Sequence, residues 1–165
     1  MEVCMGKVPV PTAKFRSVQE ITPEVLKHYG IRCVLTDLDS TLVPHAFPEP
    51  DDFARKWLDT MRGAGIPVCI ISNNSRRRTA PFAAEAGVAY FYRAYKPSVK
   101  YVEKALKVLG CTADEAVFIG DQLFTDIRTA QKAGMKSFLV DPVGTKTTLF
   151  IRFKRHLEAR LTKEG

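Results

Sequence analysis

The chain has 165 residues, of which 45% are hydrophobic and 26% charged; this allows one domain with a full core and excludes two enzyme domains of ordinary size. The formal net charge is +7, and residues 146–165 supply +4 of it, through six Lys and Arg against two acids. The basic excess therefore lies mostly in the C-terminal tail.

Strand and helix patterns alternate along the chain. Residues 1–20 predict an extended N-terminal arm on the surface, and Thr22 with Pro23 predicts the start of a short helix that Gly30 ends. Apolar runs predict buried strands at 31–36, 66–71, 88–92, 116–119 and 136–140, and helical patterns are predicted at 51–62, 75–86, from Pro97 to about 109, and at 124–133. This alternation predicts an α/β fold, with a parallel sheet covered by helices on both faces and wound by right-handed crossovers.

Two carboxylates follow the first buried strand. Asp37 and Asp39 are two residues apart, so an extended backbone directs both to the same side. Like charges at this separation are tolerated when a divalent cation neutralises them, or when one carboxyl keeps a proton for general acid catalysis. On this stretch alone, a turn in which both side chains cap the next segment through backbone hydrogen bonds is an equal alternative.

Other polar side chains follow the later strands in the same way. Ser72 follows the second strand, Lys96 the third and Asp121 the fourth. In open α/β sheets these strand ends line one crevice where ligands bind, and unrelated turn residues would not be expected to sort like this. Carboxylates for a hard cation, a hydroxyl at a helix N-terminus and an ammonium group each match part of a bound phosphoryl group.

Four motifs in this order resemble the haloacid dehalogenase superfamily phosphatases. They are Asp37-Leu38-Asp39-Ser40-Thr41, Ser72 after IPVCII, Lys96-Pro97, and the GDQLFTD segment with Asp121 and Asp126. The stretches TPEVLK, ISNN and RFKRHLEAR are similar to the small YqeG-like subgroup of subclass IIIA, which is related to phosphatidylglycerophosphate phosphatases. The resemblance covers nearly the whole chain and implies a three-layer Rossmann-like fold as one domain over residues 1–165.

The resemblance implies an Mg²⁺-dependent phosphomonoester hydrolase. It makes Asp37 the nucleophile that forms an aspartyl-phosphate, and Asp39 the general acid and base. Mg²⁺ would be held by the Asp37 carboxylate, the Asp39 backbone carbonyl and Asp121, with Asp126 supporting the metal site from outside. The residues expected to bind phosphoryl oxygens are Thr41, Ser72, Asn73 and Lys96. Ser40 departs from the family pattern, which often has Asn there, and this is expected to alter loop hydrogen bonds rather than chemistry.

The substrate implied by the subgroup is a lipid phosphate such as phosphatidylglycerophosphate. The alternatives are a sugar phosphate, a nucleotide or a phosphoprotein, or a non-catalytic scaffold that binds a membrane or nucleic acid. A receiver domain fits less well, because its phosphoacceptor follows a later strand. Nucleic acid is not expected as a partner, since the aromatic run Tyr90-Phe91-Tyr92 has no interleaved basic residues. The three arginines at 76–78 fall in the first turn of a predicted helix and are interpreted as a solvated basic face, with a role near an anionic substrate as the alternative. His45 is interpreted as an exposed loop residue, with contact to a leaving group as the alternative.

The motif spacing leaves no room for a cap domain. Leu38 and Ser72 are 34 positions apart, and Ser72 and Lys96 are 24 apart, distances that a loop, a helix and a strand already use. The crevice is therefore predicted to be open, or to be closed by a neighbouring subunit in a homo-oligomer.

Cysteine usage and hydropathy predict a cytoplasmic protein. Cys4, Cys33, Cys69 and Cys111 form no CxxC pair, which favours a reduced, intracellular chain. The sequence begins with no charged leader and apolar segment, and no apolar run approaches the ~18 residues that span a bilayer.

The tail at 145–164 predicts a basic amphipathic helix. One face carries Leu149, Phe150, Phe153, Leu157 and Leu161, while Arg152, Arg155 and His156 lie away from its centre. The leading expectation is that this face packs on the sheet domain and the basic residues are solvated. A dimer contact and peripheral association with an anionic membrane are the alternatives.

Overall fold

The structure, a computed structural model, describes residues 7–45, 47–144 and 146–163. Six strands form one sheet in the order β1-β6-β5-β2-β3-β4. They are β1 (Ala13–Phe15), β2 (Cys33–Thr36), β3 (Val68–Ile71), β4 (Ala89–Phe91), β5 (Ala116–Gly120) and β6 (Lys136–Val140). Every neighbouring pair is parallel, which confirms the predicted α/β class.

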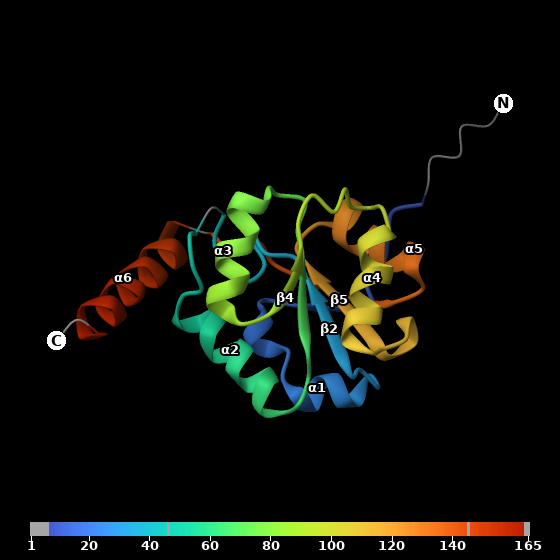
Figure 1. Cartoon of the computed structure of the whole chain (residues 1–165), viewed down its shortest axis with the longest axis horizontal. Helices are drawn as coiled ribbons and strands as arrows, with labels where there is room; N and C mark the ends of the chain where they lie inside the picture. The colour runs from blue at the N-terminus through green and yellow to red at the C-terminus, as the bar shows by residue number, and fades with distance from the viewer. Residues whose placement is uncertain (1–6, 46, 145, 164–165) are drawn as a thin grey trace.

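Helices cover both faces of the sheet (Figure 1). One core contains Val34 of β2 and side chains from α1 (Pro23–His28), α2 (Asp52–Gly63) and α3 (Arg76–Ala86). The other contains Leu35, the next residue of β2, with side chains from α4 (Lys100–Leu109) and α5 (Arg128–Ala133). Successive residues of a strand point to opposite faces, so the fully buried strands contribute side chains to both cores. The short helices η1 (Val18–Glu20) and η2 (Ala113–Glu115) lie in connections.

The predicted N-terminal arm is partly wrong. Residues 13–15 form β1, which pairs with β6 at the edge of the sheet. The Thr12 N–H donates to the Ser137 carbonyl at 2.8 Å, and the Phe15 and Phe138 ring centroids are 5.0 Å apart. Three residues are too few to show a strand pattern in the sequence. This segment becomes a strand because it pairs with β6.

The predicted helix at 124–133 begins differently in the structure. A π-helical turn, η3 (Leu123–Ile127), precedes α5, and the N–H groups of Asp126 and Ile127 both donate to the Gln122 carbonyl, at 3.0 and 3.2 Å. A π turn holds an extra residue, which rotates the side chains around it. Asp126 is buried here, at the carboxyl end of β5.

The final helix, α6 (Lys146–Lys163), extends outward from the three-layer body (Figure 1). Its predicted packing is wrong for the described side chains: Phe153, Leu157 and Leu161 are exposed, whereas Arg152 is buried. Arg152 forms an ion pair with Asp51, so this cation is not solvated as expected. The side chains at 149, 150 and 156 lie outside the described part. No helix in the described ranges combines the length and apolarity needed to cross a membrane.

Candidate active site

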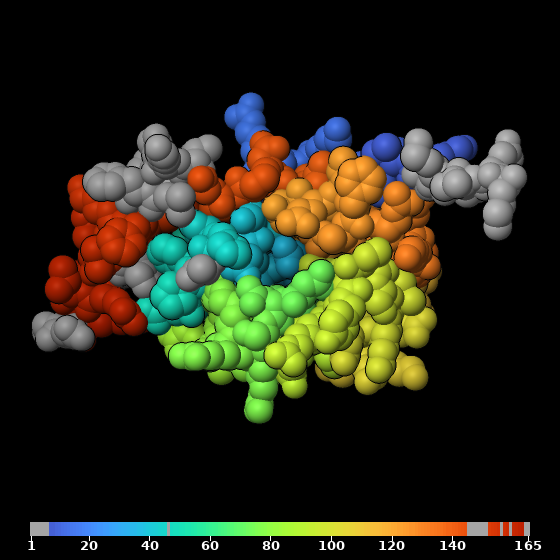
Figure 2. All heavy atoms as spheres, turned by 90° about the horizontal axis from the view of Figure 1, so that it is seen from above, coloured from blue at the N-terminus to red at the C-terminus, as the bar shows by residue number. Residues whose placement is uncertain are grey.

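A cavity of about 350 Å³ opens at the carboxyl ends of β2 to β5. Figure 2 looks onto this end of the molecule, with the segments that follow those strands around the hollow. The lining residues are Asp37, Asp39, Ser40, His45, Ser72, Asn73, Asn74, Lys96, Gln122, Thr125 and Asp126. Of the predicted strand-end side chains, Asp37, Asp39, Ser72 and Lys96 line the cavity; Asp121 does not line it but lies close to Asp37 and Asp126.

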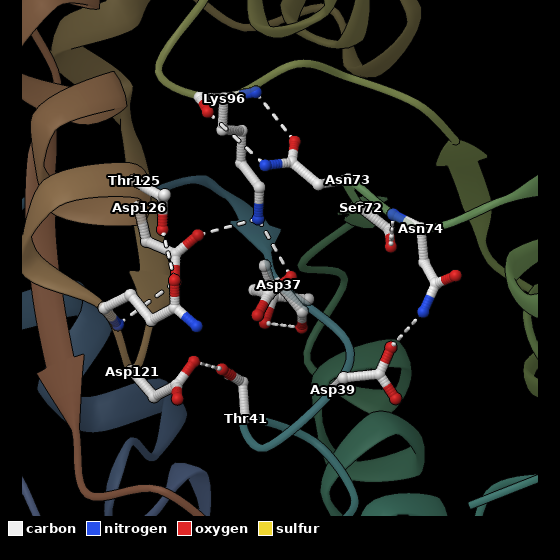
Figure 3. A network of polar contacts seen from close by, with 12 residues as sticks. Asp37, Asp39, Thr41, Ser72, Asn73, Asn74, Lys96, Asp121, Thr125 and Asp126 are labelled. Atoms are coloured by element: carbon white, nitrogen blue, oxygen red, sulfur yellow. Dashed lines mark hydrogen bonds and ion pairs between the residues drawn. The ribbon is translucent and has the colours of Figure 1, made fainter. Parts of the chain in front are cut away.

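Lys96 joins two carboxylates at the floor of this cavity (Figure 3). Its Nζ donates to Asp37 Oδ1 at 2.8 Å and to Asp126 Oδ1 at 2.7 Å. The Lys96 side chain is only 3% exposed. Burial by itself would lower the Lys96 pKa, but the charges of Asp37 and Asp126 outweigh burial and raise the pKa above its ordinary value. Lys96 is therefore a buried cation held between two acids.

Three carboxylates form a group that suits a metal ion. One oxygen each of Asp37, Asp121 and Asp126 lies within 4.8 Å of the others. Burial, and then the nearby Asp37 charge, raises the pKa values of both Asp121 and Asp126. Hard oxygen ligands arranged like this fit Mg²⁺, and a divalent cation would relieve their mutual repulsion. Asp126, expected to support the metal site from outside, is one of the three.

The Asp39 carboxylate points away from this group (Figure 3). Its Oδ2 accepts a hydrogen bond from Asn74 Nδ2 at 3.2 Å, and its Oδ1 accepts two from Arg78, from Nε at 3.2 Å and from Nη2 at 2.8 Å. The predicted solvated basic face is therefore wrong for Arg78, although Arg76 and Arg77 are exposed. Arg78 lies in the first turn of α3, whose N-terminus faces the crevice. This position in the predicted helix was the one sequence feature that pointed to a place near the site.

The segment after β3 is fixed to the segment after β4 by Asn73. Its Oδ1 accepts from the Lys96 backbone N–H at 2.7 Å, and its Nδ2 donates to the Lys96 carbonyl at 3.3 Å. Ser72 is buried, and its Oγ accepts from the Asn74 N–H at 3.0 Å. On the other side of the cavity, Thr41 Oγ1 donates to Asp121 Oδ1 at 3.2 Å. Asn73 and Thr41 thus already contact protein groups of the site.

Two lining residues within the GDQLFTD segment were not predicted. The Gln122 N–H donates to Asp126 Oδ2 at 3.2 Å, and the Thr125 hydroxyl donates to Gln122 Oε1 at 2.9 Å. Within this motif, only the two acids, Asp121 and Asp126, were predicted as site residues. In the described ranges, no folded lid is inserted between β2 and α2 or between β3 and α3, in agreement with the predicted absence of a cap.

Comparison with known proteins identifies the group to which this architecture belongs. A family model described as haloacid dehalogenase-like hydrolase matches residues 46–134. The probable phosphatase YqeG of Bacillus subtilis (strain 168) is 34% identical over 157 residues, which cover 95% of this chain and 91% of that protein. Phosphatidylglycerophosphate phosphatase 1, chloroplastic/mitochondrial, of Arabidopsis thaliana is 27% identical over 93% of this chain, but only 47% of that protein is covered.

Solved structures add agreement in fold. The cobalt-bound deoxy-D-mannose-octulosonate 8-phosphate phosphatase of Haemophilus influenzae superposes with a TM-score of 0.55, covering 81% of this chain and 91% of that one, at 18% identity. At this identity the likeness concerns the fold alone. The family model and the extended match to YqeG agree with the motif order and the acidic crevice. This chain belongs to the haloacid dehalogenase-like hydrolases, in the branch of that superfamily that holds the YqeG-like phosphatases.

Proposed function

We propose that the protein hydrolyses phosphomonoesters by transferring the phosphoryl group to Asp37. The observation that carries this proposal is the position of Lys96, which bonds Asp37 and Asp126 beside a third carboxylate, Asp121. The ammonium group holds one Asp37 oxygen in place at 2.8 Å, and it would also neutralise an incoming phosphoryl oxygen.

The reaction has two steps, both centred on Asp37. In the first, an Asp37 oxygen bonds to phosphorus and the ester P–O bond breaks, while Asp39 gives its proton to the departing alcohol oxygen. In the second, water attacks phosphorus, the Asp37–phosphoryl bond breaks, and Asp39 takes the proton from water. Asp39 contacts Asn74 and Arg78 in the structure, so its carboxyl group must turn toward Asp37 to act.

The acidic group fits a bound Mg²⁺. The residues proposed to hold it are Asp37, Asp121 and Asp126, with the Asp39 backbone carbonyl. Bound there, the ion would screen Asp37 from an anionic substrate and stabilise charge on phosphoryl oxygens.

The Ser72 hydroxyl accepts a bond from the Asn74 amide, and its own O–H can donate to a phosphoryl oxygen at the N-terminus of the eleven-residue helix α3. Thr41 and Asn73 are proposed to act indirectly, because they orient Asp121 and Lys96.

We infer that the substrate is a phosphomonoester on a bulky carrier, with a lipid phosphate such as phosphatidylglycerophosphate as the leading candidate. The open crevice supports a bulky substrate, and one relative is named for this activity. Sugar phosphates, nucleotides and phosphopeptides are the alternatives. Measurement of kcat/KM for each, with the lipid in mixed micelles, distinguishes them.

Replacement of the nucleophile tests the proposal. Asp37→Asn should reduce Mg²⁺-dependent phosphate release to background, because the amide neither attacks phosphorus nor binds the ion well. Asp39→Asn should reduce turnover of an alkyl phosphate by ~10²–10⁴-fold, the usual contribution of a general acid. With an aryl phosphate, whose leaving group needs no proton, Asp39→Asn should accumulate phosphoenzyme that acid quenching traps. Exposed Asp59→Asn is the control. Wild-type turnover by Asp37→Asn would refute the mechanism.

A further inference from the structure

Helix α6 presents apolar side chains to solvent and a charged one to the protein. Arg152 is only 4% exposed, whereas Phe153, Leu157 and Leu161 are 52%, 44% and 71% exposed. These three apolar residues follow one another at four-residue spacing, so they form one stripe along the helix. Leu157 is five positions after Arg152, which puts the stripe about 140° around the helix from the side that contacts the body. We call these three residues the outer stripe of α6.

Cations border the outer stripe. The exposed basic residues on the described part of α6 are Lys154, Arg155, Arg160 and Lys163, against one exposed acid, Glu158. On a helical wheel, Lys154 lies beyond one edge of the stripe and Arg160 beyond the other. Arg160 contacts Glu49 at 2.7 Å, yet its side chain is still 63% exposed. An apolar stripe with basic flanks is the pattern of helices that lie in a membrane interface.

We propose that the outer stripe of α6 docks this protein on an anionic lipid bilayer. The protein's own body is not the partner, because Arg152 faces it and the stripe faces away. A second copy fits less well. The surface of three partly exposed side chains is much smaller than the ~800 Å² that each partner buries in a standard protein interface. Pairing two copies through this helix would also bring together two tails that each carry a net charge of +4. An anionic bilayer satisfies both features: its apolar interior buries the stripe, and its acidic headgroups attract the flanking cations.

Helix α6 is anchored to the segment that borders the crevice. Just before α6, the Val143 N–H donates to the Ser40 carbonyl at 2.8 Å, and within α6 Arg152 Nη2 donates to the Leu42 carbonyl at 2.8 Å. Both acceptors belong to the segment that follows Asp39. In Figure 2, α6 lies to the left of the hollow on the same side of the molecule. Docking through α6 would therefore attach the bilayer to a helix that is bonded to the segment beside the crevice.

Vesicle co-sedimentation of the full chain tests the proposal. Wild type should bind vesicles of phosphatidylcholine and phosphatidylglycerol but not phosphatidylcholine alone, and added NaCl should weaken binding because it screens the cations. Replacing all three stripe residues with Gln should weaken partitioning by about tenfold or more, since the apolar contribution is lost. Val108→Gln removes an exposed apolar residue from α4 and should change nothing. The same assay with Asp37→Asn should match wild type, so binding is scored independently of hydrolysis.

A second variant tests the charges. Lys154→Gln with Arg160→Gln removes the two cations that flank the stripe, so it should weaken binding to anionic vesicles and flatten its salt dependence, and both sites are exposed, so folding should be unaffected. Light scattering after size exclusion gives the oligomeric state of each protein. The proposal is wrong if wild type ignores anionic vesicles at low salt, or if the Gln stripe variant binds as wild type does. It is also wrong if wild type is a dimer that this variant converts to monomer, because a second copy would then cover the stripe.

Discussion

Lys96 compensates for an arrangement of acids that would otherwise disfavour folding. Asp37, Asp121 and Asp126 converge within 4.8 Å, and the Lys96 ammonium is bonded to two of them. Both the Lys96 side chain and the Asp126 side chain are almost fully buried, at 3% and 1% exposed. A carboxylate in such a site depends on its partner charge, because water cannot solvate it.

Lys96→Met should therefore destabilise the metal-free protein by ~3–5 kcal/mol, the usual cost of removing one member of a buried ion pair. Mg²⁺ should raise the Tm of this variant by more than it raises the wild-type Tm, since the ion replaces the missing positive charge. Thermal unfolding with Mg²⁺ and with EDTA measures both effects. Lys107→Met, at an exposed position of α4, is the control and should change neither value. Equal Mg²⁺ shifts in Lys96→Met and wild type would contradict the proposed metal site.

The junction between β5 and η3 depends on the absence of a side chain at Gly120. A Cβ at this position would lie 2.3 Å from both Cβ and Oδ2 of Asp126. Asp126 cannot easily move aside, because Lys96 and the Gln122 N–H both hold its carboxylate. The strand and the π-helical turn therefore approach each other as closely as glycine permits.

Gly120→Ala should lower the free energy of unfolding by ~1–3 kcal/mol, as overpacking does, and reduce phosphatase activity because Asp126 is displaced. Gly63→Ala is the matched control: its Cβ would meet nothing within 4 Å, and it ends helix α2. There Ala should be neutral or slightly stabilising, as helix propensity predicts. Urea unfolding and activity assays compare the two. Unchanged activity in Gly120→Ala would argue against a role for Asp126 position.

The sequence predicts some elements better than others for physical reasons. The central strands β2, β3 and β5 are continuous apolar runs, buried on both faces, and their positions are predicted well. β1 has only three residues and takes its conformation from β6. An α-helix and a π turn have similar apolar patterns, so the sequence did not separate η3 from α5.

The same contrast holds within the candidate site. Asp37, Asp39, Ser72, Lys96 and Asp121 follow strands, so the fold brings them together wherever the helices lie. Asp126 lies in η3, and its position depends on the π turn. Arg78 differs, because it lies on a helix and its contact with Asp39 depends on the rotation of α3. A run of three arginines gives no indication of which one faces inward. Only the packed structure distinguishes Arg78 from Arg76 and Arg77.

Across the whole molecule, a buried ion pair connects the C-terminal helix to the body. Arg152 bonds both carboxylate oxygens of Asp51 and also the Leu42 carbonyl. Asp51 in turn accepts from the Ala54 N–H at 2.9 Å and caps the start of α2. This group of polar contacts therefore joins three parts of the chain: helix α6, helix α2 and the segment after Asp39. We call it the polar anchor of α6.

Removing the cation from this anchor should release α6 without disrupting the crevice. Arg152→Met leaves the buried Asp51 carboxylate without its charge partner, so we expect a loss of ~3–5 kcal/mol in unfolding free energy or, if α6 detaches first, rapid amide exchange confined to that helix. Arg155→Met is a close control. The Cζ atoms of Arg152 and Arg155 both lie 5.1 Å from the Phe53 ring centroid, but Arg155 is exposed. Its effect should stay within ~0.5 kcal/mol. Hydrogen exchange by mass spectrometry and urea unfolding measure both variants. Equal losses in the two would show that stacking on Phe53, and not the ion pair with Asp51, holds the helix to the body.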